Sequence, residues 1–428
     1  MKHADIIQTL NLEQKCALLS GETVFTTRAL PGKGIPAITL SDGPNGVRKQ
    51  AGAADHLGLN PSVPATCFPT SSATACSWDE KLGEAVGEAL GEEAAGQEVA
   101  VLLGPGLNIQ RSPLCGRDFE YFSEDPILAG RMAAAYVRGI QKNGISACPK
   151  HFAVNSQELR RMASDSVLDE RTLRELYLTG FEIVVKEAKP KTIMTSYNLI
   201  NGTYANENAH LLQDILRKDW GFDGAVVTDW GGSNDHALGV KNGSTLEMPC
   251  PGGDSIRELM KAVQDGKISE ADVDARLDEM LELVLSTHAA VEKAPRTFDA
   301  AAHHKLARRA AAESIVLLRN EGGILPLKPN EKLAVIGDFA ETPRYQGAGS
   351  SAVNALQVDT LLDCIKADDS GITLVGYASG FERQGAADAE KLEEAVALAK
   401  KADTVLLCLG LDELRESCLS YTSPSPRD

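Results

Sequence analysis

The sequence contains no apolar run that approaches the about 18 residues expected of a membrane-spanning helix. Its first 21 residues also lack the apolar stretch and the cleavage site of a secretory signal peptide. The nine cysteines are scattered, and none belongs to a CxxC pair, which suggests a reducing compartment rather than a disulfide framework. We therefore expect a cytoplasmic protein without a membrane partner.

Positive charge is also scarce. There are 43 Lys and Arg residues against 60 Asp and Glu, and the formal net charge of −17 argues against nucleic acid as a partner. The eight histidines show no ligand spacing beyond the adjacent His303 and His304, so we expect no metal ion. The other residues, 43% hydrophobic and 24% charged, are typical of a globular protein of two or three domains. The oligomeric state stays open.

Short apolar runs alternate with longer amphipathic stretches over residues 1–290. This alternation predicts βαβ units with parallel strands, and the length is close to the ~250 residues of a (β/α)₈ barrel. An open, doubly wound sheet is the second choice, because no glycine-rich phosphate loop follows the first run. The runs are 36–40, 99–109, 145–149, 191–196, 224–228 and 244–249, and the helical stretches are 79–97, 126–143, 169–188, 208–218 and 254–265.

The pattern changes after the predicted barrel. Residues 291–331 are polar, with a helix expected over 303–319 and a Gly- and Pro-rich end, and this predicts a linker. A second α/β pattern over 332–416 predicts an incomplete α/β sandwich domain with an uncovered apolar face. Residues 417–428 show no periodicity, so we expect a non-native or disordered tail. The strand-like runs of the second domain are 332–338, 372–378 and 404–410, and its expected helix is 387–402.

The run VVTDWGG, residues 226–232, carries the strongest chemical signal. Two valines lead into a lone carboxylate, Asp229, and the aromatic Trp230 follows it. A strand that ends in an acid beside an aromatic ring suits a sugar-cleaving site, in which the acid attacks or stabilises the anomeric carbon and the indole receives the sugar ring. The alternative is an aspartate that caps the next helix.

Polar residues also follow other runs, at the strand ends where either sheet architecture would place its active site. Asp42 follows the first run, although a turn at the next Gly-Pro pair would also explain it. Lys150 and His151 follow the third run, and Tyr197 follows the fourth. Retaining cleavage of a glycoside needs two carboxyl groups ~5–5.5 Å apart, and positive charge near the nucleophile keeps it ionised.

Five motifs follow one another in the first domain: SDGPNGVR, NIQRSPLCGRDFEYFSEDP, CPKHFAVNSQELRRMASDSVLDERTLRELYL, MTSYNLINGTYAN and VVTDWGG. Together they resemble glycoside hydrolase family 3, and within it the β-glucosidases. The resemblance covers roughly residues 1–290 and continues through ESIVLLRNEGGILPL, LAVIGDFA and QGAGSSAVN. It implies a barrel followed by an (α/β)₆ sandwich, hydrolysis of β-linked sugars with retention, and no cofactor.

The resemblance also implies roles for individual residues. Asp229 would be the nucleophile, and Asp42 would bind the 4- and 6-hydroxyls of the glycone. Ser350 would reach the aglycone from the second domain, or it is an ordinary loop serine. Glu158 is expected to pair with an arginine, and Asp125 to cap a helix. The substrate-binding set would be Asp42, Arg48, Arg117, Lys150, His151, Arg161, Tyr197, Trp230 and Ser350, although Arg117 could instead form a surface ion pair with Asp118 or Glu120.

The general acid/base is missing from this set. In the family's β-glucosidases it is a glutamate of the second domain, and this chain departs from the family pattern after about residue 416, before that glutamate. An Asp-His dyad in a loop after His151, as in the family's N-acetylglucosaminidases, is disfavoured because AVNSQELRR stands there. We therefore expect a retaining exo-hydrolase that releases terminal β-D-glucose from β-glucosides or short oligosaccharides, with impaired activity. The alternatives are a β-xylosidase or arabinosidase of the same family and a non-catalytic carbohydrate-binding fragment.

Overall fold

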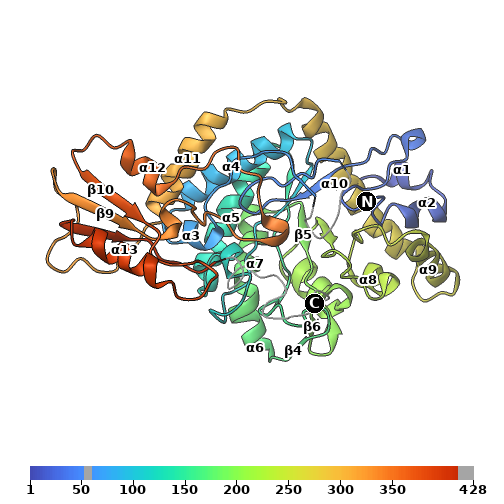
Figure 1. The fold of residues 1–428 in the computed structure, drawn as a ribbon. Helices are drawn as coiled ribbons and strands as arrows, with labels where there is room; N and C mark the ends of the chain where they lie inside the picture. Colours follow the sequence, from blue (N-terminus) through green and yellow to red (C-terminus); the bar gives the residue numbers. More distant parts are fainter. Residues whose placement is uncertain (53–59, 413–428) are drawn as a thin grey trace.

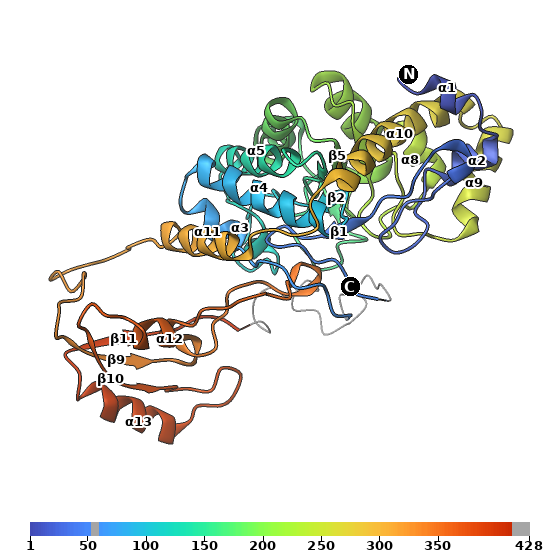
Figure 2. The same cartoon turned by 90° about the horizontal axis from the view of Figure 1, so that it is seen from above.

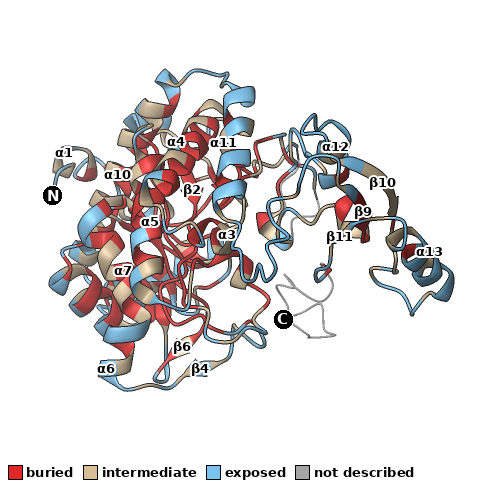
Figure 3. Cartoon of the chain, turned by 90° about the vertical axis from the view of Figure 1, so that its left-hand side faces the viewer, coloured by how far each residue is buried: buried red, intermediate tan, exposed pale blue. Residues whose placement is uncertain are grey.

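The chain folds into two lobes in the computed structural model, which describes residues 1–52 and 60–412 (Figures 1 and 2). The first lobe contains the elements from α1 to α11, and the second contains those from β9 onward. A long connection, residues 314–331, runs between them. Buried residues concentrate in the first lobe, around one large hydrophobic cluster, whereas the second lobe has two small clusters (Figure 3).

The first lobe alternates strands with helices. Its α-helices are α1 (Ala4–Ile7), α2 (Leu12–Ala17), α3 (Ser71–Ala75), α4 (Glu80–Gly96), α5 (Pro126–Gln141), α6 (Glu170–Thr172), α7 (Thr179–Ile183), α8 (His236–Asn242), α9 (Gly253–Gln264), α10 (Glu270–Lys293) and α11 (Ala300–Glu313). Its strands are β1 (Leu40–Asp42), β2 (Val101–Leu103), β3 (Ser146–Ala147), β4 (Asp165–Ser166), β5 (Thr192–Met194), β6 (Leu199–Ile200), β7 (Thr203–Tyr204) and β8 (Ala225–Val227). Short 3₁₀ turns are η1 (Pro31–Lys33), η2 (Asp118–Glu120) and η5 (Ala205–Glu207), and π-helical segments are η3 (Leu173–Leu178), η4 (Val184–Ala188) and η6 (His210–Asp219).

Strands of the first lobe pair around a ring. β1, β2 and β3 are parallel neighbours, and β5 pairs in parallel with β8. Isolated bridges complete the ring: Phe152 with Thr195, Val227 with Leu246, Ser20 with Glu247, Gly21 with Thr27, and Thr26 with Thr39. Because these five strands run in the same direction, their carboxyl ends lie on the same side of the lobe.

Helices α4 and α5 cover the ring as a closely packed pair. Gly87 of α4 lies against the backbone of Tyr136 in α5, and Gly139 of α5 lies against the backbone of α4. A side chain at either glycine would collide with the opposite helix. Asp125 begins α5 by accepting from the backbone N–H groups of the first turn, with a proline at the first helical position. The predicted capping role of Asp125 is confirmed.

The second lobe is a three-stranded parallel sheet in the order β10–β9–β11, with a helix on each face (Figure 2). Val335 of the central strand packs in a cluster with Leu362 of α12, and the next residue, Ile336, packs with Ala395 of α13. The edge strand β11 is poorly covered, since Leu407 is 55% exposed, although each face of the sheet carries a helix. The elements are β9 (Lys332–Ile336), β10 (Thr373–Ala378), β11 (Thr404–Leu407), α12 (Leu361–Lys366), α13 (Ala389–Ala399), and the 3₁₀ turns η7 (Asp338–Ala340) and η8 (Gly349–Ser351).

Most predicted elements of the first lobe exist. The run 244–249 forms isolated bridges at Leu246 and Glu247 rather than a strand, and several elements, of which α10 is the longest, were not predicted. The helix predicted over 303–319 ends at Glu313, because the β-branched Ile315 and Val316 that follow favour extended backbone. Residues 315–318 are 56–91% exposed.

Two further expectations concern the ends and the surroundings of the chain. The predicted tail, residues 417–428, lies outside the described residues. Within the part of the chain that the structure describes, no helix combines the length and the apolar character needed to cross a membrane. The eight described cysteines are all free thiols.

Candidate functional site

Asp229 lies just beyond the end of β8, on the side of the ring where the strands end. Its Oδ1 accepts a hydrogen bond from the backbone N–H of Trp230 at 2.8 Å, and its Oδ2 lies 3.6 Å from Nε2 of His151. The side chain is 13% exposed, so solvent reaches the carboxylate. The next helix, α8, has Asp235 as its N-cap. Asp229 therefore caps no helix, so the alternative interpretation of Asp229 as a helix cap is wrong.

Asp42 ends β1 and lies in the same cluster of charges. Nζ of Lys150 lies 3.9 Å from its Oδ1, and the backbone N–H of Arg48 donates to its backbone carbonyl at 2.9 Å. Burial, opposed in part by Lys150 and Arg48, raises the pKa of the Asp42 carboxyl to about 6. The negative charges of Asp229 and Glu120 add to this increase in the pKa of Asp42.

His151 is held from both ring nitrogens. Nη2 of Arg117 lies 2.9 Å from Nε2, and the Tyr121 hydroxyl lies 3.2 Å from Nδ1. Arginine has only donors, so Nε2 accepts and the proton of the neutral ring is assigned to Nδ1. Burial, followed by the charges of Arg117 and Lys150, lowers the pKa of His151 well below its ordinary value. His151 is thus neutral at pH 7 and adds no positive charge beside Asp229.

Two buried glutamates hold the arginines of the site. Nε of Arg117 donates to Oε1 of Glu120, and its Nη1 lies 3.7 Å from Oε1 of Glu158. Nη1 of Arg161 donates to Oε2 of Glu158 at 2.8 Å, as predicted for this structural glutamate. Burial alone would lower the pKa of Arg117, but the glutamates hold it well above its ordinary value. The pair of Arg117 with Glu120 is buried rather than on the surface, and the sequence analysis did not assign Glu120 to the site.

Tyr197 and Trp230 fix each other beside Asp229. The Tyr197 hydroxyl donates to the backbone carbonyl of Trp230 at 2.8 Å. Burial and the Asp229 carboxylate raise the pKa of Tyr197 well above its ordinary value, so the phenol keeps its proton. The guanidinium of Arg161 lies over the Tyr197 ring, 4.7 Å from its centre. The indole of Trp230 donates to the backbone carbonyl of Val24 at 2.7 Å, which fixes the ring's orientation.

Ser350 is the candidate residue that the second lobe contributes. It lies in η8, and the chain just beyond it docks on the first lobe, where the backbone N–H of Ala65 donates to the carbonyl of Asn354 at 3.0 Å. Over residues 1–52 and 60–412, no hydrogen bond or ion pair joins Ser350 to the other candidate side chains. The departure from the family pattern after about residue 416 lies outside the described residues.

The structure thus brings nine of the ten candidate residues to one side of the ring. Two partly exposed carboxylates lie among buried cations and neutral donors, an arrangement that can accept from and donate to adjacent hydroxyls of one sugar. Within residues 1–52 and 60–412, no three His, Cys, Asp or Glu side chains are grouped to hold a metal ion. The nine are Asp42, Arg48, Arg117, Lys150, His151, Arg161, Tyr197, Asp229 and Trp230.

Both halves of the sequence match known family domains. Residues 56–283 match the Glycosyl hydrolase family 3 N terminal domain, and residues 315–423 match the Glycosyl hydrolase family 3 C-terminal domain. The chain belongs to glycosyl hydrolase family 3. The resemblance inferred from the five motifs is therefore confirmed.

Relatives within this family carry more than one activity. The chain is 45% identical over 416 residues to thermostable beta-glucosidase B of Acetivibrio thermocellus, and 44% identical over 422 residues to an exo-alpha-(1->6)-L-arabinopyranosidase of Bifidobacterium longum. Each match covers 96% of this chain and 55% of the relative. The crystal structure of a Bifidobacterium adolescentis family 3 beta-glucosidase superposes with a TM-score of 0.89 at 42% identity, over 95% of this chain and 58% of that one. The family 3 chain thus spans little more than half the length of these relatives.

Proposed function

We propose that the chain carries the sugar-binding and nucleophilic groups of a retaining, exo-acting β-glucosidase, which releases terminal β-D-glucose from β-glucosides or short oligosaccharides. The observation that supports this most is the partly exposed carboxylate of Asp229 at a strand end, 3.6 Å from His151 and close to a second carboxylate, Asp42. The beta-glucosidase relatives support the choice of glucose.

In the proposed first step, a carboxylate oxygen of Asp229 attacks the anomeric carbon as the bond from that carbon to the leaving oxygen breaks. Water then cleaves the glycosyl-enzyme ester with overall retention. Asp42 accepts from the glycone hydroxyls, and Lys150 donates to them beside it. Tyr197 positions Asp229 through the Trp230 backbone, and the Trp230 ring receives the sugar.

Further hydroxyl contacts are proposed for the other cationic and polar groups. Arg117 and Arg161, each held by a glutamate, present fixed guanidinium donors to the sugar hydroxyls. Neutral His151 can bind a sugar hydroxyl only if its ring turns, which breaks its hydrogen bonds to Arg117 and Tyr121. Arg48 is proposed to orient Asp42, and Ser350 to reach the aglycone.

The domain arrangement is part of the proposal. We assign a (β/α)₈-type barrel to residues 1–290, a linker to 291–331, a partial α/β sandwich to 332–416 and a non-native tail to 417–428, in a cytoplasmic protein. The ring of parallel strands and the helix on each face of β10–β9–β11 support this division. Limited proteolysis should cut first between residues 314 and 331. Early cleavage inside the barrel would contradict the division.

The acid/base glutamate is proposed to be absent from these 428 residues. General acid catalysis contributes typically ~10²–10⁴-fold, so cleavage of cellobiose should be slower by about that factor than in a complete β-glucosidase. Aryl glucosides with good leaving groups need little protonation and should be spared. Cellobiose turnover at ordinary enzyme rates would overturn this part of the proposal.

The nucleophile can be tested directly by mass spectrometry. A 2-deoxy-2-fluoro glucoside with an activated leaving group should form a stable covalent adduct on Asp229 of the wild type and none on Asp229→Asn. Asp235→Asn, which changes a nearby helix cap, is the matched control and should still be labelled. A folded wild type that is not labelled would leave a non-catalytic carbohydrate-binding fragment as the better description.

A second candidate is a pentosidase activity, either β-xylosidase or arabinosidase. It is favoured by the arabinopyranosidase relative, whose identity to this chain nearly equals that of the beta-glucosidase. Initial rates with aryl β-glucoside, aryl β-xyloside and aryl α-L-arabinopyranoside distinguish the candidates. A higher kcat/KM for either pentoside than for the glucoside would replace glucose as the proposed glycone.

A further inference from the structure

The sheet of the second lobe has an open edge at β11. This strand pairs with β9 on one side, and over residues 1–52 and 60–412 no segment pairs with its other side. The backbone N–H of Cys408 donates to the carbonyl of Ile336 in β9, and hydrogen bonds alternate along a strand, so the backbone groups of Val405 and Leu407 point to the open edge. Residues 404–411 contain no charge and no proline, the features that usually protect an edge strand from pairing.

An apolar patch lies beside this edge, on the face of the sheet that carries α13. Leu407 pairs in register with Ile336, whose side chain packs with α13, so the Leu407 side chain lies on this face. Leu398 contacts β10, which places Leu392 and Val396, on the opposite flank of α13, toward β11. We call these side chains the α13 patch, and their exposed fractions are 59% for Leu392, 46% for Val396, 41% for Val405 and 55% for Leu407.

A strand-like segment without a sheet follows α11. Residues 315–318, with the sequence IVLL, belong to no helix or strand, and their side chains are 56–91% exposed. Within the described part of the chain, the backbone N–H and C=O groups of Val316, Leu317 and Leu318 have no hydrogen-bond partner. β-Branched and leucine side chains on an unpaired backbone favour pairing with a strand. The chain thus carries an open edge and a segment able to cover it.

The two segments complement each other when they run antiparallel. With Leu317 opposite Val405, Arg319 lies opposite Asp403, and opposite charges at such positions stabilise a strand pair. A parallel arrangement of the same pair would separate the two charges. In the single chain Arg319 contacts the exposed Glu321, a surface pair that holds it weakly. In the antiparallel register Leu317 falls on the same face as Val405, where it covers the α13 patch.

The exposed apolar area is of the size that a dimer buries. A leucine-sized side chain removes about 100 Å² from water when it is buried, so residues 315–318 and the α13 patch expose roughly 500 Å² on each copy. A standard interface buries ~800 Å² per partner, of which a little over half is apolar. We propose that two copies of this chain form a two-fold dimer, in which residues 315–318 of each copy pair with β11 of the other. Because the exchange is reciprocal, the assembly closes at two copies.

Sedimentation velocity of the 428-residue chain over a concentration series tests this dimer, independently of any hydrolase activity. The chain should dimerise with a roughly micromolar dissociation constant. Arg319→Asp and Asp403→Arg each place like charges opposite each other twice in the dimer, so each variant alone should dimerise about tenfold more weakly. An equimolar mixture of the two variants should recover the wild-type affinity, because opposite charges then face each other in both strand pairs.

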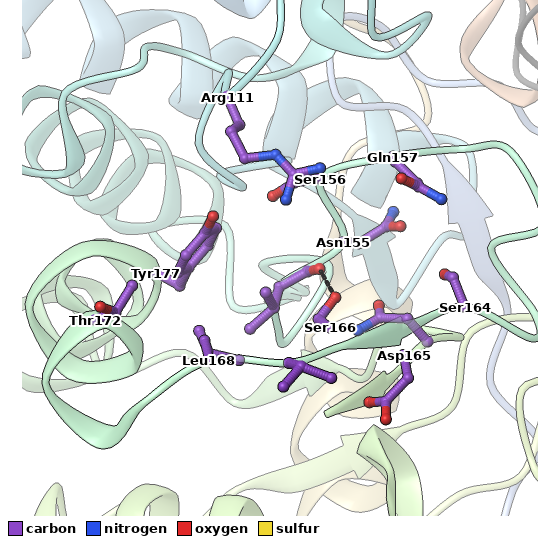
Figure 4. A pocket seen from close by; sticks show the side chains of 13 residues that line it. Arg111, Asn155, Ser156, Gln157, Ser164, Asp165, Ser166, Leu168, Thr172 and Tyr177 are labelled. Atoms are coloured by element: carbon purple, nitrogen blue, oxygen red, sulfur yellow. Dashed lines mark hydrogen bonds between the residues drawn. The ribbon is translucent and has the colours of Figure 1, made fainter. Parts of the chain in front are cut away.

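Leu317→Ser should weaken the dimer at least tenfold, because each dimer loses the side chain twice. The matched control is Val167→Ser, at an 80% exposed side chain that lines a pocket of the first lobe (Figure 4), and it should leave the dimer unchanged. A chain that stays monomeric at about 100 µM, assemblies larger than dimers, a mixture that does not recover, or equal effects of Leu317→Ser and Val167→Ser would overturn the proposal. Circular dichroism checks folding. If Asp403→Arg misfolds because its carboxylate no longer accepts from the backbone of Lys332, Leu317→Ser and its control decide.

Discussion

Replacing Asp42 by asparagine should change how the stability of the first lobe depends on pH. Burial raises the pKa of the Asp42 carboxyl from 3.8 to about 6. Between these values the folded protein holds a proton that the unfolded chain has released, so wild-type stability falls as the pH rises. An increase of about two pKa units corresponds to about 3 kcal/mol, lost progressively between about pH 4 and pH 6 and constant above.

Asp42→Asn lacks this proton and should lose none of that stability. The substitution also alters the contacts of residue 42 with Lys150 and Arg48. That change shifts the unfolding free energy by the same amount at every pH, so only the pH-dependent part of the difference between variant and wild type is informative. The free energy of unfolding of the variant minus that of the wild type should increase by about 3 kcal/mol from pH 4 to pH 7.

Urea unfolding monitored by tryptophan fluorescence is a suitable assay, because all three tryptophans, Trp78, Trp220 and Trp230, lie in the first lobe. Asp223→Asn is the matched control, since the Asp223 side chain is 89% exposed, and its curve should run parallel to that of the wild type. A variant curve that also runs parallel to the wild type between pH 4 and 7 would refute the reasoning, because Asp42 would then be solvated like Asp223.

Three other predictions concern stability and association. Glu158→Ala should destabilise the first lobe by about 3–5 kcal/mol in urea unfolding, because Arg117 and Arg161 would be left without this buried partner. The control Glu182→Ala, which removes an exposed ion pair, should cost less than about 1 kcal/mol. Equal losses of stability in the two variants would contradict the buried network. Burial lowers the pKa of His303, but Glu93 and Glu92 outweigh it and raise that pKa above its ordinary value. The stability that this contact contributes is therefore complete below about pH 6.5 and is lost as the pH rises through the raised pKa. His303→Gln should remove this decline in thermal unfolding, and the idea fails if both proteins decline alike. Leu318→Ser, at a side chain that is 91% exposed, should change stability by less than about 0.5 kcal/mol but reduce self-association in light scattering, and a large loss of stability would show that Leu318 is packed.

Strands and most helices were predictable because their signals are local. The buried run just before Asp229, for example, is the strand Ala225–Val227, and Asp125 before a proline is a recognisable helix cap. Helix α10 also had a legible signal, a capping box at Ser269 and Asp272 followed by apolar residues at helical spacing, and the analysis missed it. The end of α11 at Glu313 was harder to predict. The apolar pattern that follows fits either a helix or an extended segment, and only the β-branched Ile315 and Val316 favour the extended one.

The arrangement of the site was predictable only in part. Strand ends predicted that Asp42, Lys150 and Asp229 would lie together, since parallel strands end on one side. The neutral state of His151 depends on burial and on Arg117, which is distant in sequence, so no local pattern could reveal it. The same holds for Glu120, which meets Glu158 at the guanidinium of Arg117, whereas the pairing of Glu158 with an arginine was predicted. The role of Ser350 stays a prediction.

The bridges from Ser20 to Glu247 and from Thr26 to Thr39 have a consequence for how the protein is made. The amino-terminal segment joins the two ends of the ring, so the sheet cannot close until Glu247 has left the ribosome. Until then the edges of β1 and β8 remain open to other chains. A nascent chain stalled before Glu247 should therefore be a strong chaperone client and protease-sensitive, whereas one released after α10 should resist both.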